Sequence, residues 1–88
     1  MSTIVTIVFK GGLGSVEAKL FRAGVEIDKD DTDKSGDLIL KDAIPGDLIS
    51  LKGVSPANGT DVTISVPTIP PTPDHRQAGA IIKSYDVS

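Results

Sequence analysis

Apolar and polar residues alternate with a period of two along much of this chain, as they do in strands with one buried face. The alternation is clearest where Val16, Ala18 and Leu20 alternate with Glu17 and Lys19. No window repeats apolar residues at helical spacing over three turns, and nine glycines and six prolines interrupt the sequence. The pattern therefore predicts an all-β fold.

About seven segments have the alternation or the β-branched composition of strands. They are Ser2–Phe9, Val16–Phe21, Val25–Asp28, Asp37–Lys41, Asp47–Val54, Asp61–Val66 and Ala78–Val87. Short strands separated by glycine- and proline-containing turns are typical of two antiparallel sheets packed face to face. We predict an antiparallel two-sheet sandwich of about seven strands, Ig-like or prealbumin-like, whose strand order the residues leave open.

Three segments are predicted to connect these strands. Gly11–Gly14 is expected to be a flexible hairpin connection, and Ser55–Gly59 contains an Asn-Gly pair that accepts positive φ. Pro67–Gln77 is proline-rich, and proline removes the N–H that a sheet requires. We expect it to be a stiff connection that crosses between the sheets, with a Pro-x-x-Pro ligand at Pro67–Pro73 as the alternative.

With 88 residues the chain has room for one domain, 1–88, and for one compact core. It contains no cysteine, so neither disulfides nor thiolate metal sites are available. The apolar run Ile4–Phe9 is too short to span a bilayer and lacks the flanks of a signal peptide. We expect a protein of the cytoplasm or of an assembled particle or surface, without membrane insertion.

The acidity of the chain is local. Its net charge is −3, and the stretch DKDDTDKSGD at residues 28–37 alone contributes five aspartates and two lysines. Only Phe9, Phe21 and Tyr85 are aromatic, and no basic stripe is present. Nucleic acid is therefore not an expected partner, because its binding requires cationic side chains and, for single strands, stacking surfaces.

The acidic stretch allows two interpretations. Its spacing, with Gly36 at the sharp turn and Asp42 at the end, approaches that of a calcium-binding loop. Leu38 and Leu40, however, alternate with polar residues as in a strand, whereas such a loop should lead into a helix. We favour a solvated turn. The alternative is a calcium site, with the candidate ligands Asp31, Asp33, Ser35 and Asp37.

The same region carries a family resemblance. The segment TDKSGDLILKDAIPGDLISLKG, Thr32–Gly53, resembles the core motif of carboxypeptidase-regulatory-like and related transthyretin-like or Cna-B-type β-sandwich domains. The matching positions are Thr32, Asp33, Gly36, Leu40, Pro45 and Gly46. Leu38 and Leu48 stand where these domains usually have Phe or Tyr. The resemblance covers most of residues 15–66 and implies an accessory, adhesive or structural module, usually without catalysis.

Catalytic chemistry has few candidates. His75 is the only histidine, in the proline-rich segment, and no serine lies in a nucleophile motif. The transthyretin-like hydrolases, by resemblance, need several histidines and a Tyr-Arg-Gly-Ser tail, whereas this chain ends Tyr85–Ser88. Some Cna-B-like domains form an isopeptide bond, for which Lys10 and Asp86 would be the candidates here. We predict no catalytic residues and no cofactor.

The first strand indicates a function in protein–protein contact. Ile4–Phe9 is apolar on both faces, so it must be central in its sheet or covered by a partner. Our hypothesis is a non-enzymatic module, a structural or accessory subunit of a filament, capsid or adhesive surface. A calcium-dependent binding module is the alternative. The predicted interface residues are Ile4, Val5, Ile7, Val8 and Phe9.

Overall fold

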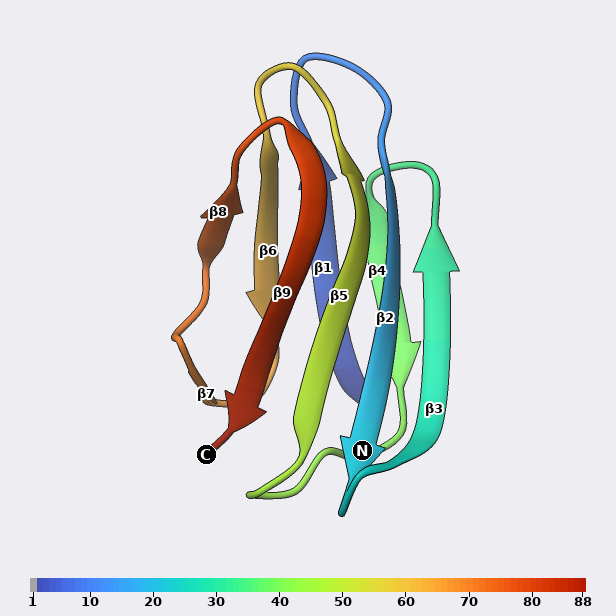
Figure 1. The fold of residues 1–88 in the computed structure, drawn as a ribbon, viewed down its shortest axis with the longest axis vertical. Coiled ribbons are helices and arrows are strands. Elements are labelled where there is room, and N and C mark those ends of the chain that lie inside the picture. The colour runs from blue at the N-terminus through green and yellow to red at the C-terminus, as the bar shows by residue number, and fades with distance from the viewer. Residues whose placement is uncertain (1) are drawn as a thin grey trace.

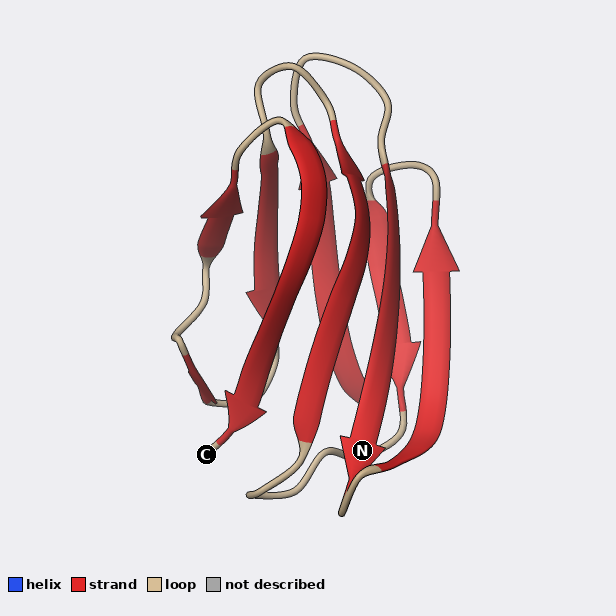
Figure 2. Cartoon of the chain, viewed as in Figure 1, coloured by secondary structure: helices blue, strands red, loops and turns tan. Residues whose placement is uncertain are grey.

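The computed structural model describes residues 2–88, and its strands form two antiparallel sheets that face each other (Figure 1). Strands and loops account for all of these residues, and none is helical (Figure 2). The predicted all-β two-sheet sandwich is confirmed, with nine strands rather than about seven. No helix capable of crossing a membrane is present within residues 2–88.

The four-stranded sheet has the order β4-β1-β6-β8, and the five-stranded sheet has the order β3-β2-β5-β9-β7. The strands are β1 (Thr3–Phe9), β2 (Ser15–Arg22), β3 (Val25–Thr32), β4 (Gly36–Leu40), β5 (Leu48–Ser55), β6 (Thr60–Ile64), β7 (Thr68–Ile69), β8 (Asp74–Arg76) and β9 (Gly79–Val87). Most connections cross from one sheet to the other. The exception is the β2–β3 hairpin, whose two turn residues Ala23 and Gly24 have φ of 52° and 78°.

The core lies between the sheets and is built from alternate residues of each strand. Along β2, Val16, Ala18 and Leu20 are at most 1% exposed, as the alternation predicts. Tyr85 on β9 is the largest fully buried side chain. All buried side-chain polar atoms of the described residues have a hydrogen-bond partner. The core therefore contains no orphaned polar group that would favour local opening.

β1 is a central strand, flanked by β4 and β6. Val5 and Ile7 are fully buried, and Phe9 packs against the core. The prediction that these three residues form an interface with a partner is therefore wrong, because the opposite sheet covers them. Ile4 and Val8 point outward from the same strand, Ile4 half-buried and Val8 41% exposed.

Gly11–Gly14 is not a hairpin, because it connects β1 of one sheet to β2 of the other. Gly14 shows how tightly this crossing is packed. A Cβ at this position would lie 2.5 Å from the carbonyl oxygen of Val54 and 2.8 Å from the Phe9 ring. Only glycine allows the backbone to pass so close to both.

The proline-rich segment crosses between the sheets, as predicted, and it adds the two short strands. β7 pairs with β9 in one sheet, and β8 pairs with β6 in the other. Between them, the hydroxyl of Thr72 accepts a hydrogen bond from the N–H of Ile64 at 3.0 Å. The crossing segment thus ties the C-terminal side of the sandwich together.

The acidic stretch is mostly strand. β3 continues to Thr32 and β4 begins at Gly36, so only residues 33–35 form a turn. The prediction that residues 28–37 form one solvated turn is therefore wrong. The stretch stays extended because of the direction in which its aspartate side chains point.

Candidate functional site

Two aspartates of β3 join the two sheets along one side. Asp28 and Asp30 pair with Leu20 and Ala18, whose side chains face the core, so both carboxylates point inward at the sheet edge. Each carboxylate accepts two backbone N–H groups. Asp28 accepts those of Lys29 at 2.9 Å and Lys41 at 2.8 Å.

Asp30 repeats the arrangement two residues along the strand. Its carboxylate accepts the N–H groups of Asp31 and Ile39, both at 2.9 Å. The acceptors advance by two along β3 while the donors retreat by two, from Lys41 just after β4 to Ile39 within it, so the bonds follow the register of an antiparallel ladder. Carboxylates thus satisfy edge donors of both sheets, and β3 can stay extended through its acidic residues.

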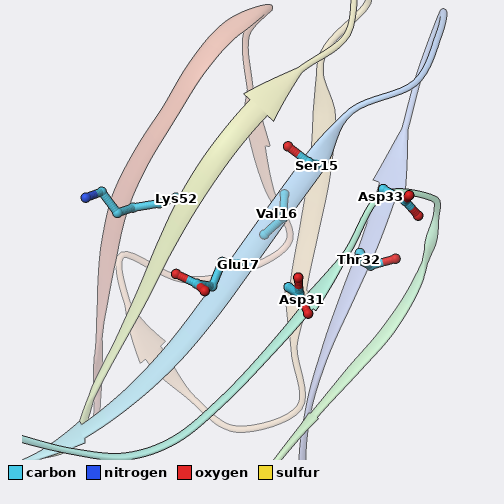
Figure 3. A pocket seen from close by; sticks show the side chains of 7 residues that line it. All are labelled: Ser15, Val16, Glu17, Asp31, Thr32, Asp33 and Lys52. Carbon is cyan, nitrogen blue, oxygen red and sulfur yellow. The ribbon is translucent and has the colours of Figure 1, made fainter.

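The predicted calcium ligands lie in two different places. Asp31 and Asp33 line a shallow hollow of about 440 Å³ on the five-stranded sheet, together with Glu17 and Lys52 (Figure 3). Glu17 stands opposite Asp31 on one side and Lys52 on the other, so the acidic pair is partly neutralised. This hollow is polar and largely open to solvent.

Ser35 and Asp37 instead bond to the first strand. The Ser35 hydroxyl accepts the N–H of Phe9 at 2.9 Å, and Asp37 accepts the Thr6 hydroxyl at 2.8 Å. Among residues 2–88, no three histidine, aspartate or glutamate side chains are grouped as they would be around a metal ion. The four candidate ligands are thus divided between the two sheets, and calcium binding stays an alternative prediction.

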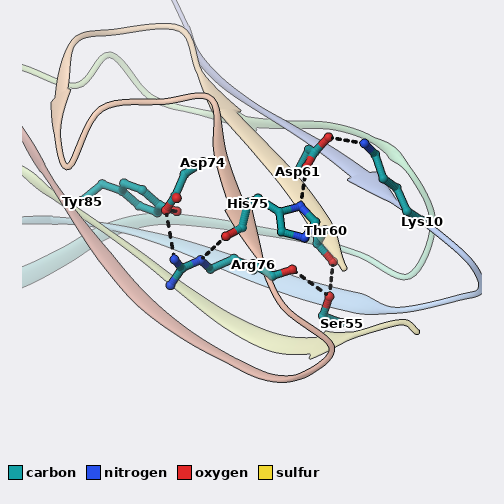
Figure 4. A network of polar contacts seen from close by, with 8 residues as sticks. All are labelled: Lys10, Ser55, Thr60, Asp61, Asp74, His75, Arg76 and Tyr85. Carbon is teal, nitrogen blue, oxygen red and sulfur yellow. Dashed lines mark hydrogen bonds and ion pairs between the residues drawn. The ribbon is translucent and has the colours of Figure 1, made fainter. Parts of the chain in front are cut away.

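His75 belongs to a polar network on the four-stranded sheet (Figure 4). Its Nδ1 lies 2.7 Å from Asp61 Oδ1, and Lys10 Nζ lies 2.7 Å from Asp61 Oδ2. The hydrogen bonds from Lys10 and then His75 lower the pKa of Asp61. The imidazole packs over Gly59, where a Cβ would lie 2.5 Å from the ring. This network orients His75 on the surface of the sheet.

Lys10, the candidate for an isopeptide bond, therefore pairs with Asp61 of the neighbouring strand β6. The other candidate, Asp86, lies near the end of β9 in the opposite sheet. Lys10 is also half-exposed, whereas the reaction would need a buried amine. The two candidate residues for this bond thus belong to the ends of strands in different sheets, and the fold does not pair them.

Tyr85 connects the sheets on the C-terminal side. Its hydroxyl donates to Asp74 Oδ2 at 2.8 Å, from β9 of one sheet to β8 of the other. Burial and this hydrogen bond raise the pKa of the Tyr85 phenol well above its ordinary value. Arg76 Nη2 lies 3.5 Å from the same carboxylate oxygen (Figure 4).

A buried carboxylate fixes the β4–β5 connection. Asp47 is 2% exposed and accepts hydrogen bonds from Arg22 Nε at 3.0 Å and from Arg22 Nη2 at 2.8 Å. It also accepts the N–H of Ile44 at 3.0 Å. The hydrogen bonds from Arg22 lower the pKa of Asp47 against the opposing effect of burial. This cluster is structural, since its polar atoms face one another.

Exposed apolar side chains gather on the outer face of the five-stranded sheet, near the beginning of β9. Ile82 is 76% exposed and Val54 on β5 is 56% exposed. Ala80 lies directly opposite Val54 and two residues from Ile82 on the same face. These residues form the exposed apolar patch.

The sequence itself carries a signal for this patch. Tyr85 and Val87 point inward, and counting back by two along β9 adds Lys83 and Ile81 to the inward row, so Ile82 falls on the outward row. An isoleucine on the outward row of a strand is a candidate contact residue. β1 is more apolar than β9, so the sequence favours β1 as the interface with a partner.

Comparisons of the chain with protein-family models, with curated proteins and with solved structures found no match.

Proposed function

We propose that this chain is a non-enzymatic protein-contact module that associates with copies of itself, as a structural or accessory subunit of a larger assembly. The observation that carries the proposal is the exposed apolar patch, Val54, Ala80 and Ile82. Its members belong to two paired strands, β5 and β9, on one sheet face, so they are contiguous rather than scattered. Contiguous apolar surface of this kind is typical of contact sites.

The polar clusters are consistent with a structural role for the remaining functional groups. His75 and Asp61 bond to each other, and the hydroxyls of Ser55 and Thr60 bond to each other at 2.7 Å. Arg22 and Asp47 hold a connection between strands. In each cluster, hydrogen bonds within the fold explain why the polar residues are present, so no substrate is needed to explain them.

We also infer that the chain is a divergent member of the carboxypeptidase-regulatory-like and transthyretin-like sandwiches. The support is the two-sheet architecture together with the turn at Pro45-Gly46, where Gly46 has φ of 96° and a side chain would be strained. In the motif, Leu40 is a core residue of β4. Accessory and adhesive functions of such domains agree with a contact module.

The proposal is tested by sedimentation equilibrium from micromolar to millimolar concentration, with calcium and with a chelator. We expect a reversible, concentration-dependent oligomer that is the same under both conditions. A protein that stays monomeric over the whole range would contradict the proposal. Association or a higher melting temperature with calcium only would support the calcium-dependent alternative, since a ligand of the folded state stabilises it.

A further inference from the structure

β9 has a long unpaired edge. It pairs with β5 from Gly79 to Asp86, but on its other side β7 covers only Asp86 and Val87. β8, which precedes β9 in the chain, belongs to the opposite sheet (Figure 1). The residues from Gly79 to Tyr85 therefore have no strand beside them on the outer side.

The direction of the backbone groups follows from one hydrogen bond. Val87 donates its N–H to the carbonyl oxygen of Asp47, which precedes β5, at 2.8 Å. Backbone groups of an antiparallel strand alternate in direction, so every second residue before Val87 also points toward β5. The N–H and C=O groups of three intervening residues point away from it, and no residue of 2–88 pairs with them: Ala80, Ile82 and Ser84.

On the other side of the sandwich, side chains bond to the backbone at the sheet edges. There, the carboxylates of Asp28 and Asp30 satisfy N–H groups at the edges of both β3 and β4. Natural proteins use inward-pointing charges of this kind to prevent an edge from pairing with another chain. The outward row of β9 from Ala80 to Ser84 carries no charged side chain, and the inner row of this edge carries one, Lys83. Carboxylates thus occupy edge N–H groups on one side of the sandwich. On the β9 side, the outward N–H and C=O groups of Ala80, Ile82 and Ser84 have no partner within residues 2–88.

Space beside the open edge is available. A hollow of about 410 Å³ lies along it, with Ala80 and Ile82 on one wall and His75 and Arg76 of β8 on the other. An extended strand that enters here can bond to the free backbone groups and cover Ile82. This is strand addition to a sheet edge, in which main-chain bonds supply affinity and side chains supply specificity.

We propose that the occupant is β9 of a second copy, paired antiparallel about a two-fold axis at Ile82. This inference rests on the proposed function and specifies its contact. The two five-stranded sheets then become one continuous sheet, and each exposed Ile82 is covered by its counterpart.

The sequence of β9 is self-complementary in this register. Ile82 meets Ile82, and Ala80 meets Ser84 on both sides of the axis. On the inner row, Ile81 meets Lys83, so no two like charges stand directly opposite each other. Every outward N–H and C=O of Ala80, Ile82 and Ser84 gains a partner. A two-fold contact between identical patches has this self-complementary form.

The first test is Ile82→Lys, which brings two ammonium groups together at the axis. The control is Val25→Lys, which changes an apolar residue of 61% exposure on the opposite edge of the same sheet. By sedimentation equilibrium we expect Val25→Lys to associate like the unmodified chain and Ile82→Lys to associate at least about tenfold more weakly. Circular dichroism checks that both variants are folded.

The outcomes separate this inference from the proposed function. If the unmodified chain associates and Ile82→Lys associates equally well, the β9 contact is wrong while the contact module stands. If the unmodified chain is monomeric throughout, both are wrong.

A second test uses the absence of cysteine from the chain. Hydrogen-bonded residues opposite each other in antiparallel strands have Cα atoms about 5.5 Å apart, within the range that a disulfide spans. We therefore expect Ile82→Cys to form a disulfide-linked dimer in a glutathione buffer much faster than Val25→Cys. Equal rates for the two variants would overturn the proposed pairing.

Discussion

Tyr85 is the only tyrosine of the chain and its largest fully buried side chain among the described residues. Its ring fills the core, and its hydroxyl reaches Asp74 in the opposite sheet. A buried phenol that donates to a carboxylate resists ionisation, because the phenolate would lose its hydration and face a negative charge. The residue therefore connects packing in the core with the pH dependence of stability.

We expect the phenol of Tyr85 not to titrate normally while the protein is folded. Its pKa is raised above the unfolded value of about 10. The associated stability is complete below that pH and decreases as the pH rises beyond it, because the unfolded state then loses its proton more readily. Tyrosinate absorbance should increase together with the loss of circular dichroism. Normal titration in a chain with unchanged circular dichroism would contradict this.

Asp47 gives the opposite prediction at low pH. Its pKa is lowered in the folded state, so its contribution is present at neutral pH and is lost as the pH falls through the lowered value. We expect Asp47→Asn to destabilise the protein at pH 7 and the difference from the unmodified chain to shrink in acid, in urea unfolding at each pH. Asp33→Asn, in the exposed turn, removes the same charge as a control. A difference for Asp47→Asn that is independent of pH would argue against the ion pair.

At the scale of elements, β3 shows how side chains can decide where a strand ends. Aspartate is unfavourable in strands, and this one contains Asp28, Asp30 and Asp31. The strand persists because two of these carboxylates bond to the backbone of β3 and β4. Among residues 2–88, no carboxylate bonds in this way to the unpaired edge of β9, where β7 covers only Asp86 and Val87.

We expect Asp30→Ala to loosen the β3–β4 side without unfolding the domain. Two N–H groups lose their acceptor near solvent, so the free energy of unfolding should fall by about 1 kcal/mol. Hydrogen exchange of the Ile39 amide should become faster, while exchange of core amides such as that of Leu51 changes only by the global loss. Asp33→Ala, which has no bond to β4, is the control. Unchanged protection of Ile39 would show that the carboxylate bond is not formed in solution.

For the whole molecule, stability depends on one core between two sheets. A chain of this size is expected to have only about 4–13 kcal/mol of stability. Inward-facing and outward-facing positions of the same strand should therefore differ greatly in how much a mutation lowers the free energy of unfolding. β5 offers a matched pair in Leu51, which is fully buried, and Val54, which is 56% exposed.

We expect Leu51→Ala to cost about 3 kcal/mol, through lost burial and the cavity that remains. The melting temperature should then fall by about 12–24 °C. Val54→Ala should change the stability of the monomer by less than about 0.5 kcal/mol. Thermal unfolding followed by circular dichroism at low concentration measures both. Similar losses for the two variants would contradict the assignment of inner and outer faces.

Much of this architecture could be predicted from local residues. The alternation at Val16, Ala18 and Leu20 identified an inward face, and the prolines of Pro67–Gln77 identified a crossing between sheets. The unpaired edge of β9 could not be predicted in the same way. Alternation along β9 places Ile82 on the outward row, whereas the backbone edge beside it is unpaired because β7 reaches only Asp86 and Val87, and no local pattern records how far a neighbouring strand extends.

The sequence by itself determined the fold class, because a period of two, frequent glycine and proline, and β-branched residues act within a few neighbours. Only the tertiary structure decided the strand order, the burial of β1 and the role of Asp28 and Asp30. Pairing between strands that are distant in the chain depends on the whole set of contacts that the two sheets make together. A strand that is apolar on both faces is therefore recognisable from the sequence, whereas the neighbour that covers it is known only from the fold.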